Sequence, residues 1–142
     1  MAIPAIDASS DLLHLGLRPD GTAEVPEDFD LASWYDLGGR PGGTGMPTVI
    51  LGHVDSTSGP AIFFRLRDLS RGDEVEVAMS DGSTATYAVT GTEEFPKDQF
   101  PTAAVFGATR DDVVRLVTCS GEFDRGDRSY TDNLVVSAER IA

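Results

Sequence analysis

Residues that form covalent or metal cross-links are scarce in this sequence, which contains one cysteine, Cys119, and two histidines among 142 residues. A single cysteine cannot form an internal disulfide, so the fold must be held together by its core alone. A structural zinc site usually takes four ligands from cysteine and histidine, more than this chain can supply. We therefore expect no disulfide, no required metal and no cofactor.

Long hydrophobic runs and positive charge are scarce as well. No stretch approaches the roughly 18 to 20 apolar residues of a membrane span, and the N-terminus lacks the basic-then-apolar order of a signal peptide. The net charge of −13 repels phosphate groups, so we expect no nucleic-acid partner and no unaided binding to anionic lipid. A chain of 142 residues can bury one proper core, so we expect a single domain over residues 1–142.

Alternating apolar and polar residues predict strands rather than helices. In residues 74–90, Val75 and Val77 alternate with charged residues, residues 81–82 (Asp-Gly) offer a tight turn, and Tyr87 resumes the alternation, which is typical of a β-hairpin. Further strands are expected at 48–51, 113–119 and 133–138, shorter ones at 3–6 and 12–17, and short helical turns near 31–34, 61–66 and 99–105. Short strands, 15 glycines, 8 prolines and no long helix indicate an all-β barrel or sandwich.

Cys119 ends an apolar run and is followed by Ser120 and Gly121, so we expect it where a strand gives way to a loop. A lone cysteine in a small domain is commonly buried and inert. Loops at the ends of rigid elements, however, are where binding and catalytic groups concentrate. The thiolate is the attacking species and an unperturbed thiol has a pKa of about 8.5, so a reactive Cys119 needs a base or a positive neighbour.

Two histidines and two arginines are candidates for those neighbours. His14 is flanked by leucines and fits a strand residue, whereas His53 follows a strand and a glycine and precedes a polar loop. A loop of about a dozen residues after Cys119 permits antiparallel neighbouring strands, which would bring Arg128 to the same sheet edge. A guanidinium there would stabilise an oxyanion. Spacing alone does not choose between Arg128 and Arg125.

These motifs together resemble the sortases, the cysteine transpeptidases of Gram-positive cell surfaces, and among them the actinobacterial class F type. The family's motif of leucine, any residue, threonine and catalytic cysteine stands here as residues 116–119, "LVTC", although Arg115 replaces the threonine often found before it. The family's histidine follows a strand and a glycine, as in "ILGHVDS", and its arginine precedes the last strand, as in "RSYTDNLVV". The segments "DGTAEVP", "WYDLGGRPGGTG" and "FFRLRDLSRGDEVEV" also resemble the class F pattern.

The resemblance implies a closed β-barrel of about eight strands with His53, Cys119 and Arg128 as the catalytic residues, and it prefers Arg128 over Arg125. It implies cleavage of a Leu-Pro-any-Thr-Gly sorting signal between Thr and Gly through a thioacyl intermediate, with transfer to an amine. Thr118 would contribute to substrate binding beside the nucleophile. The implied partners are sorting-signal peptides of surface proteins and an amine acceptor from the cell wall. The implied location is the extracellular face of the membrane, reached through an N-terminal anchor that we interpret as lost or removed.

Four other interpretations stay open. A caspase-like peptidase shares the order His before Cys and the Cys-any-Gly spacing, but its fold needs helices between parallel strands. Papain-like enzymes place Cys before His, against the order here. An L,D-transpeptidase shares the cell-wall location and a β-rich fold, but its Ser-His-Gly-Cys type motif is absent around Cys119. A secreted β-domain that binds a ligand, with Cys119 buried, is the non-enzymatic alternative.

Overall fold

Strands dominate the part of the chain that the structure describes. A computed structural model covers residues 1–19, 24–56, 58–101, 105–124 and 129–142, with the backbone alone at 121–124 and 129. The strands are β1 (Ala2–Ile3), β2 (Ala8–Ser9), β3 (Leu12–Leu15), β4 (Ala32–Tyr35), β5 (Thr48–Leu51), β6 (Asp55–Ser56), β7 (Gly59–Pro60), β8 (Glu74–Ala78), β9 (Thr84–Pro96), β10 (Val113–Asp124) and β11 (Ser129–Arg140). Single 3₁₀ turns lie at η1 (Pro4–Ile6), η2 (Leu66–Asp68) and η3 (Lys97–Gln99). The predicted all-β class is confirmed.

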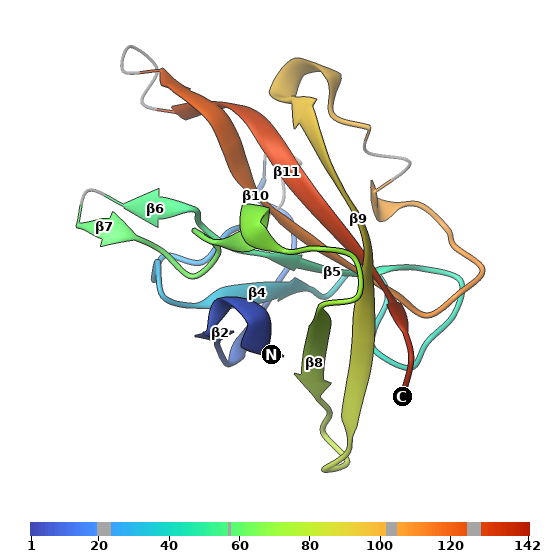
Figure 1. The fold of residues 1–142 in the computed structure, drawn as a ribbon. Helices are drawn as coiled ribbons and strands as arrows, with labels where there is room; N and C mark the ends of the chain where they lie inside the picture. Colours follow the sequence, from blue (N-terminus) through green and yellow to red (C-terminus); the bar gives the residue numbers. More distant parts are fainter. Residues whose placement is uncertain (20–23, 57, 102–104, 125–128) are drawn as a thin grey trace.

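One curled sheet forms most of the molecule. Among the described residues, nine strands join it in the order β2-β1-β8-β9-β11-β10-β5-β4-β3, and β6 and β7 form a separate hairpin (Figure 1). The two edge strands β2 and β3 are separated in the chain by Ser10 and Asp11 alone, so the sheet must curl until its edges approach each other. The barrel-like fold is thereby confirmed, although the ladders between described residues include no pairing of β2 with β3.

The hairpin predicted over residues 74–90 is present. Strand β8 pairs antiparallel with β9, and Gly82 between them has φ +87, a left-handed conformation that favours glycine. Buried side chains occupy every second position, at Val75 and Val77 of β8 and at Ala85 and Tyr87 of β9, while the residues that alternate with them within each strand are partly or fully exposed. The alternation in the sequence therefore predicted correctly which side chains of this hairpin face the core.

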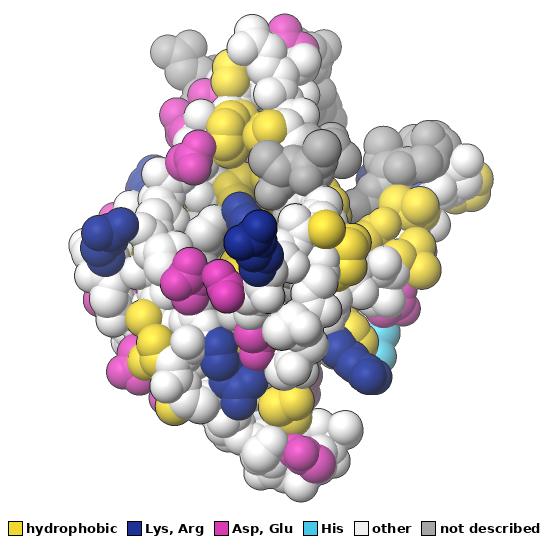
Figure 2. Space-filling model, turned by 90° about the vertical axis from the view of Figure 1, so that its right-hand side faces the viewer, with side chains coloured by type: hydrophobic (Ala, Val, Ile, Leu, Met, Phe, Trp, Pro, Cys, Tyr) yellow, Lys and Arg dark blue, Asp and Glu magenta, His cyan; other side chains and the backbone are white. Residues whose placement is uncertain are grey.

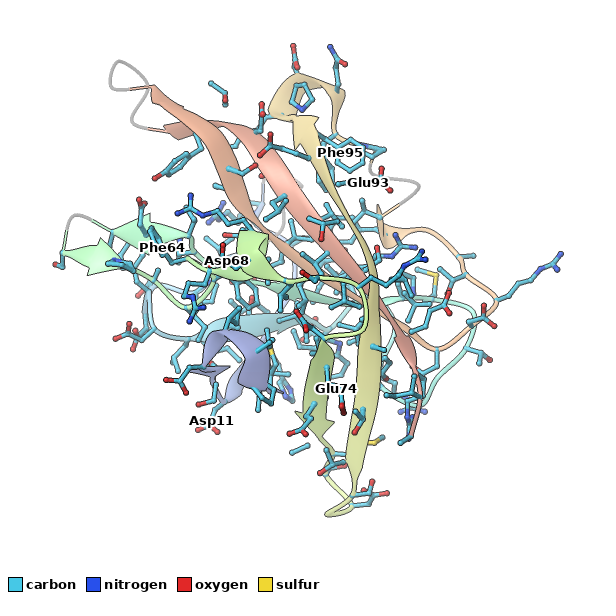
Figure 3. The ribbon with its side chains drawn as sticks, in the orientation of Figure 1. Asp11, Phe64, Asp68, Glu74, Glu93 and Phe95 are labelled. Carbon is cyan, nitrogen blue, oxygen red and sulfur yellow. The ribbon has the colours of Figure 1, made fainter. Side chains whose placement is uncertain are left out.

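Buried side chains of β5 and β10 divide between two hydrophobic clusters, one on each face of the sheet. Ile50 and Leu116 belong to the main core inside the curl, where they join Phe63. Leu51 and Val117 belong to a second cluster on the other face, which Phe95, Phe100 and Phe106 cover. Figure 3 shows Phe95 near the end of β9. Because both faces are covered, β5 is buried along its whole length, as its continuous apolar run suggests.

Some expected elements differ in type or length. The helical turn expected near 31–34 is wrong: β4 occupies it, because this segment pairs with β3 on one side and β5 on the other. The strand expected over 3–6 ends at Ile3, since Pro4 has no N–H to donate to a ladder and instead begins η1. The helical turn expected near 61–66 appears as η2, displaced along the chain. The one expected near 99–105 includes residues 102–104, which lie outside the described residues, and the two residues that follow them, 105–106, are helical.

Candidate active site

Cys119 lies within β10, not at its end. The expectation that the strand stops at this cysteine is wrong, because β10 continues to Asp124. The Ser-Gly pair that reads as a strand end instead coincides with a shift of register between Ser120 and Phe123, and pairing with β11 continues beyond it. Cys119 itself lies opposite Asn133 of β11 and is partly exposed.

The parallel pairing of β5 and β10 places Cys119, within β10, level with His53, which follows the end of β5. Val117 lies opposite Leu51, and the Gly52 amide donates to the Val117 carbonyl at 3.2 Å, so the register continues past the end of β5. His53 comes two positions after Leu51, and Cys119 comes two positions after Val117. The register therefore brings the backbone of His53 alongside that of Cys119, although the His53 side chain does not line the cavity that adjoins Cys119.

The His53 ring is held by a segment that the sequence reasoning missed. Its Nε2 lies 2.6 Å from the carbonyl oxygen of Pro26, and its ring centroid lies 4.4 Å from that of Phe29. A carbonyl oxygen only accepts hydrogen bonds, so Nε2 carries a proton and donates it. Nδ1 is left as the ring nitrogen that can exchange a proton with other groups. The segment "DGTAEVP", which ends at Pro26, contributes to the family resemblance, but its contact with His53 joins distant parts of the chain and was not predicted.

A cavity of about 110 Å³ adjoins Cys119. Its walls are Thr118, Cys119 and Ser120 of β10, Tyr130 and Leu134 of β11, Glu94 of β9, and Val54, Phe63, Phe64 and Arg67 of the segment after β5. Figure 3 shows Phe64 close to the β6–β7 hairpin. The cavity is therefore formed where the ends of three neighbouring strands meet the chain that follows His53.

Thr118, the predicted substrate-binding residue, lines this cavity. Its side chain is 4% exposed, and its hydroxyl has no hydrogen-bond partner among the described residues, nor has that of Ser120. A buried hydroxyl without a partner is costly, so such groups are commonly found where a ligand or water binds. The cavity beside Cys119 is therefore polar on its β10 wall.

A tyrosine and an aspartate face each other next to the cavity. The Tyr130 hydroxyl donates a hydrogen bond to the Asp55 carboxylate. This bond is the largest cause that raises the pKa of Tyr130 to about 12, followed by burial, the charge of Asp55 and the nearby Cys119, while Arg67 acts in the opposite direction. Tyr130 therefore stays a hydrogen-bond donor at neutral pH. This pair joins residues 75 positions apart and was not predicted from the sequence.

The remaining predicted site residues fall elsewhere. Arg128 and its rival Arg125 lie outside the described residues. His14 lies in β3 and makes an edge-to-face contact with Trp34 at 4.9 Å, in keeping with the strand role expected for it. Within the described ranges, no three His, Cys, Asp or Glu side chains lie close enough to hold a metal ion.

Two larger hollows lie away from this chemistry. One of about 490 Å³ is bordered by β1, β2 and β8, and one of about 530 Å³ lies between η1 and the segment after β7. Neither is lined by a histidine or a cysteine. On the face shown in Figure 2, acidic and basic side chains lie interspersed, without a field of one sign. The small cavity beside Cys119 is therefore the stronger candidate for the active site.

Comparison with known proteins identifies the family. A family model described as "Sortase domain" matches residues 1–141. The chain belongs to the sortase family. Sortases are enzymes, the cysteine transpeptidases, and this membership confirms the family resemblance read from the sequence. A search of curated proteins finds no match.

Solved sortase structures share the fold over 99% of this chain. A lid mutant of sortase A from Corynebacterium diphtheriae is 24% identical with a TM-score of 0.76, and the chain covers 68% of it. Sortase C1 from Streptococcus agalactiae is 25% identical with a TM-score of 0.75 and 65% covered. Sortase C-1 from Actinomyces oris is 24% identical with a TM-score of 0.74 and 70% covered. This sortase chain thus spans 65% to 70% of the length of these three.

The sortase fold here contains no membrane-crossing helix among its described residues. No helix in those parts of the chain combines the length and the apolar character that crossing a bilayer requires.

Proposed function

We propose that residues 1–142 form a sortase catalytic domain that cleaves a Leu-Pro-any-Thr-Gly sorting signal between Thr and Gly and transfers the acyl group to an amine. The observation that supports this proposal is the parallel register of β5 and β10, which brings the backbone of His53 alongside that of Cys119. Nucleophilic catalysis by a partly exposed thiol needs a base within reach, and His53 is our candidate for it.

The reaction proceeds in two displacements. The Cys119 sulfur attacks the carbonyl carbon of threonine, and the tetrahedral intermediate collapses with cleavage of the Thr–Gly bond, leaving a thioester. His53 gives a proton to the departing glycine amine. The acceptor amine then attacks the thioester carbonyl, His53 takes a proton from that amine, and the Cys119 thiolate leaves. The hydrogen bond from Nε2 to Pro26 makes Nδ1 the nitrogen that exchanges these protons.

Arg128 and Thr118 take supporting roles in this scheme. The Arg128 guanidinium stabilises the oxyanion of each tetrahedral intermediate. Thr118 is positioned to contact the peptide through its buried hydroxyl in the adjoining cavity. We further propose that the enzyme is of the class F type, and that it acts at the outer face of the cell membrane on surface proteins, with a cell-wall amine as acceptor.

The decisive experiment follows a quenched fluorescent Leu-Pro-any-Thr-Gly peptide by fluorescence and mass spectrometry, with and without a glycine-based amine. The wild type is expected to cleave the peptide and to yield the amine-ligated product. Cys119→Ala and His53→Ala are expected to lose both activities. His14→Ala is the matched control, since it removes the other histidine away from Cys119, and it is expected to retain them.

Alkylation of Cys119 separates the enzyme from a ligand-binding domain. The thiol of an active sortase is expected to react with iodoacetamide in the folded protein. No cleavage by a folded wild type whose Cys119 reacts only after unfolding would contradict the proposed function and favour the binding domain.

A further inference from the structure

The hydrogen bond between Tyr130 and Asp55 joins the two sides of the Cys119 cavity. Asp55 begins β6 two positions after His53, and Tyr130 lies in β11 two positions after Arg128. Tyr130 lines the cavity together with Cys119, and so does Val54, the residue between His53 and Asp55. Figure 1 shows the β6–β7 hairpin on the same side of the molecule as the far ends of β10 and β11. The bond therefore spans the space beside Cys119.

This bond is a third contact that holds the segment after β5 in place. On one side, the Gly52 amide ties the segment to Val117 of β10 at 3.2 Å. On another, the Phe63 amide donates to the His53 carbonyl at 3.0 Å, and Ala61 donates to Val54 at 3.1 Å. The Tyr130 hydroxyl ties the same segment to β11. His53 is thus positioned relative to the strand that directly follows the predicted arginine.

The chemistry of the pair keeps the bond in place at working pH. The Asp55 carboxylate raises the pKa of Tyr130 to about 12, so the phenol keeps its proton at neutral pH. A hydrogen bond to an ionised acceptor is stronger than one between neutral groups. Arg67 at the cavity wall, whose guanidinium lies 4.9 Å from the Phe64 ring centroid, adds a positive charge near the pair.

We propose that Tyr130 and Asp55 are positioning residues, whose hydrogen bond fixes the distance between the His53 segment and strands β10, which carries Cys119, and β11. This inference rests on the proposed transpeptidase function. It assigns neither residue to a chemical step. Catalytic rates are sensitive to such spacing, because a misplacement of about 1 Å costs on the order of 100-fold in rate.

The test compares variants that remove or retain the acceptor and the donor. Tyr130→Phe and Asp55→Ala each remove the bond and are expected to lower kcat about tenfold, with KM within about twofold. The double variant is expected to be no slower than either single variant, because all three lack the same bond. Asp55→Asn keeps an oxygen that accepts from the phenol, so it is expected to restore most of kcat.

Tyr87→Phe is the matched control. It removes a second tyrosine-to-aspartate hydrogen bond, from Tyr87 to Asp112 at 2.7 Å, from a pair that does not line the Cys119 cavity. It is expected to lower the melting temperature and leave kcat unchanged. A Tyr130→Phe variant with wild-type kcat, or a double variant whose loss equals the product of the single losses, would overturn the positioning role.

A second readout keeps this test independent of peptide cleavage. The rate of Cys119 alkylation by iodoacetamide is measured in the folded wild type, Tyr130→Phe and Asp55→Asn. The positioning role predicts that Tyr130→Phe changes this rate at least about threefold and that Asp55→Asn stays close to wild type. If the wild type fails to cleave the peptide, the proposed function fails; if the alkylation rates of all three agree, the positioning role fails.

Discussion

The imidazole of His53 donates from Nε2 to the carbonyl oxygen of Pro26 at 2.6 Å. This bond selects the ring tautomer, because a carbonyl oxygen accepts and cannot donate. The reaction that we propose needs a group that gives and takes protons beside Cys119, and the contact with Pro26 leaves Nδ1 of His53 for that role.

The tautomer can be measured directly. We expect ¹⁵N NMR of the histidine side chains to show neutral His53 with its proton on Nε2. The protein has two histidines, so a His14→Gln variant assigns the signals without altering His53. A neutral His53 protonated on Nδ1 would contradict the Pro26 contact.

The two arginines between β10 and β11 in the sequence make a matched pair. Arg128→Ala is expected to lower kcat on the sorting peptide by about 10²- to 10³-fold, because it removes the proposed donor to the oxyanion. Arg125→Ala makes the same change of charge three positions earlier and is expected to stay within about twofold of wild type. Steady-state cleavage rates at saturating peptide check both, and the opposite ranking would reassign the role to Arg125.

Local alternation predicted the strands well, because a half-buried strand has one apolar face whatever it pairs with. Val75, Val77 and Tyr87 show this in the β8–β9 hairpin, and the motifs around His53, Cys119 and the predicted arginine together suggested the family, which the family model confirms. Ser120 and Gly121 were misinterpreted as the end of a strand. A bulge and a strand end look alike in sequence, since the difference lies in whether a partner strand continues alongside.

Contacts between distant segments could not be predicted from the sequence. The hydrogen bond from Tyr130 to Asp55 and the one from His53 to Pro26 depend on how the sheet curls, and no periodicity encodes that. The β4 segment was misinterpreted as a helical turn for a related reason. Its pairing with β3 and β5 outweighs a weak local preference.

Ionisation of the buried Tyr87 is expected to lower the stability of the fold at alkaline pH. Burial, followed by the hydrogen bond to Asp112, raises the pKa of Tyr87 above its usual range. In the unfolded chain a tyrosine ionises near pH 10. The contribution of Tyr87 to stability is therefore fully present below about pH 10 and is lost as the pH rises from there toward the pKa of the folded state.

Urea denaturation across this range checks the expectation. The unfolding free energy of the wild type should fall from about pH 10 upward, and that of Tyr87→Phe should fall less steeply. At neutral pH the variant is expected to be about 1 to 2 kcal/mol less stable, because it removes the Tyr87 donor to Asp112. Parallel pH curves for the two proteins would show that Tyr87 is not the titrating group.

Gly52, between β5 and His53, is expected to tolerate no side chain. A Cβ at this position would lie 2.7 Å from the Phe63 ring and 2.9 Å from the Ile62 side chain. Gly52→Ala must therefore push the segment of Phe63 away from the sheet, and with it the amide that donates to the His53 carbonyl. We expect a loss of about 1 to 3 kcal/mol in unfolding free energy and a lower kcat.

Gly91→Ala is the control for this glycine, because a Cβ there meets nothing within 4 Å, and it is expected to be neutral within about 0.5 kcal/mol. A smaller neighbour should relieve the clash, so Phe63→Leu in the Gly52→Ala background is expected to cost less than Phe63→Leu costs in the wild type. Denaturation curves for the four proteins of this cycle give the coupling energy. A coupling of zero would mean that Gly52 is required for another reason than the approach of Phe63, and then His53 would not depend on that contact for its position.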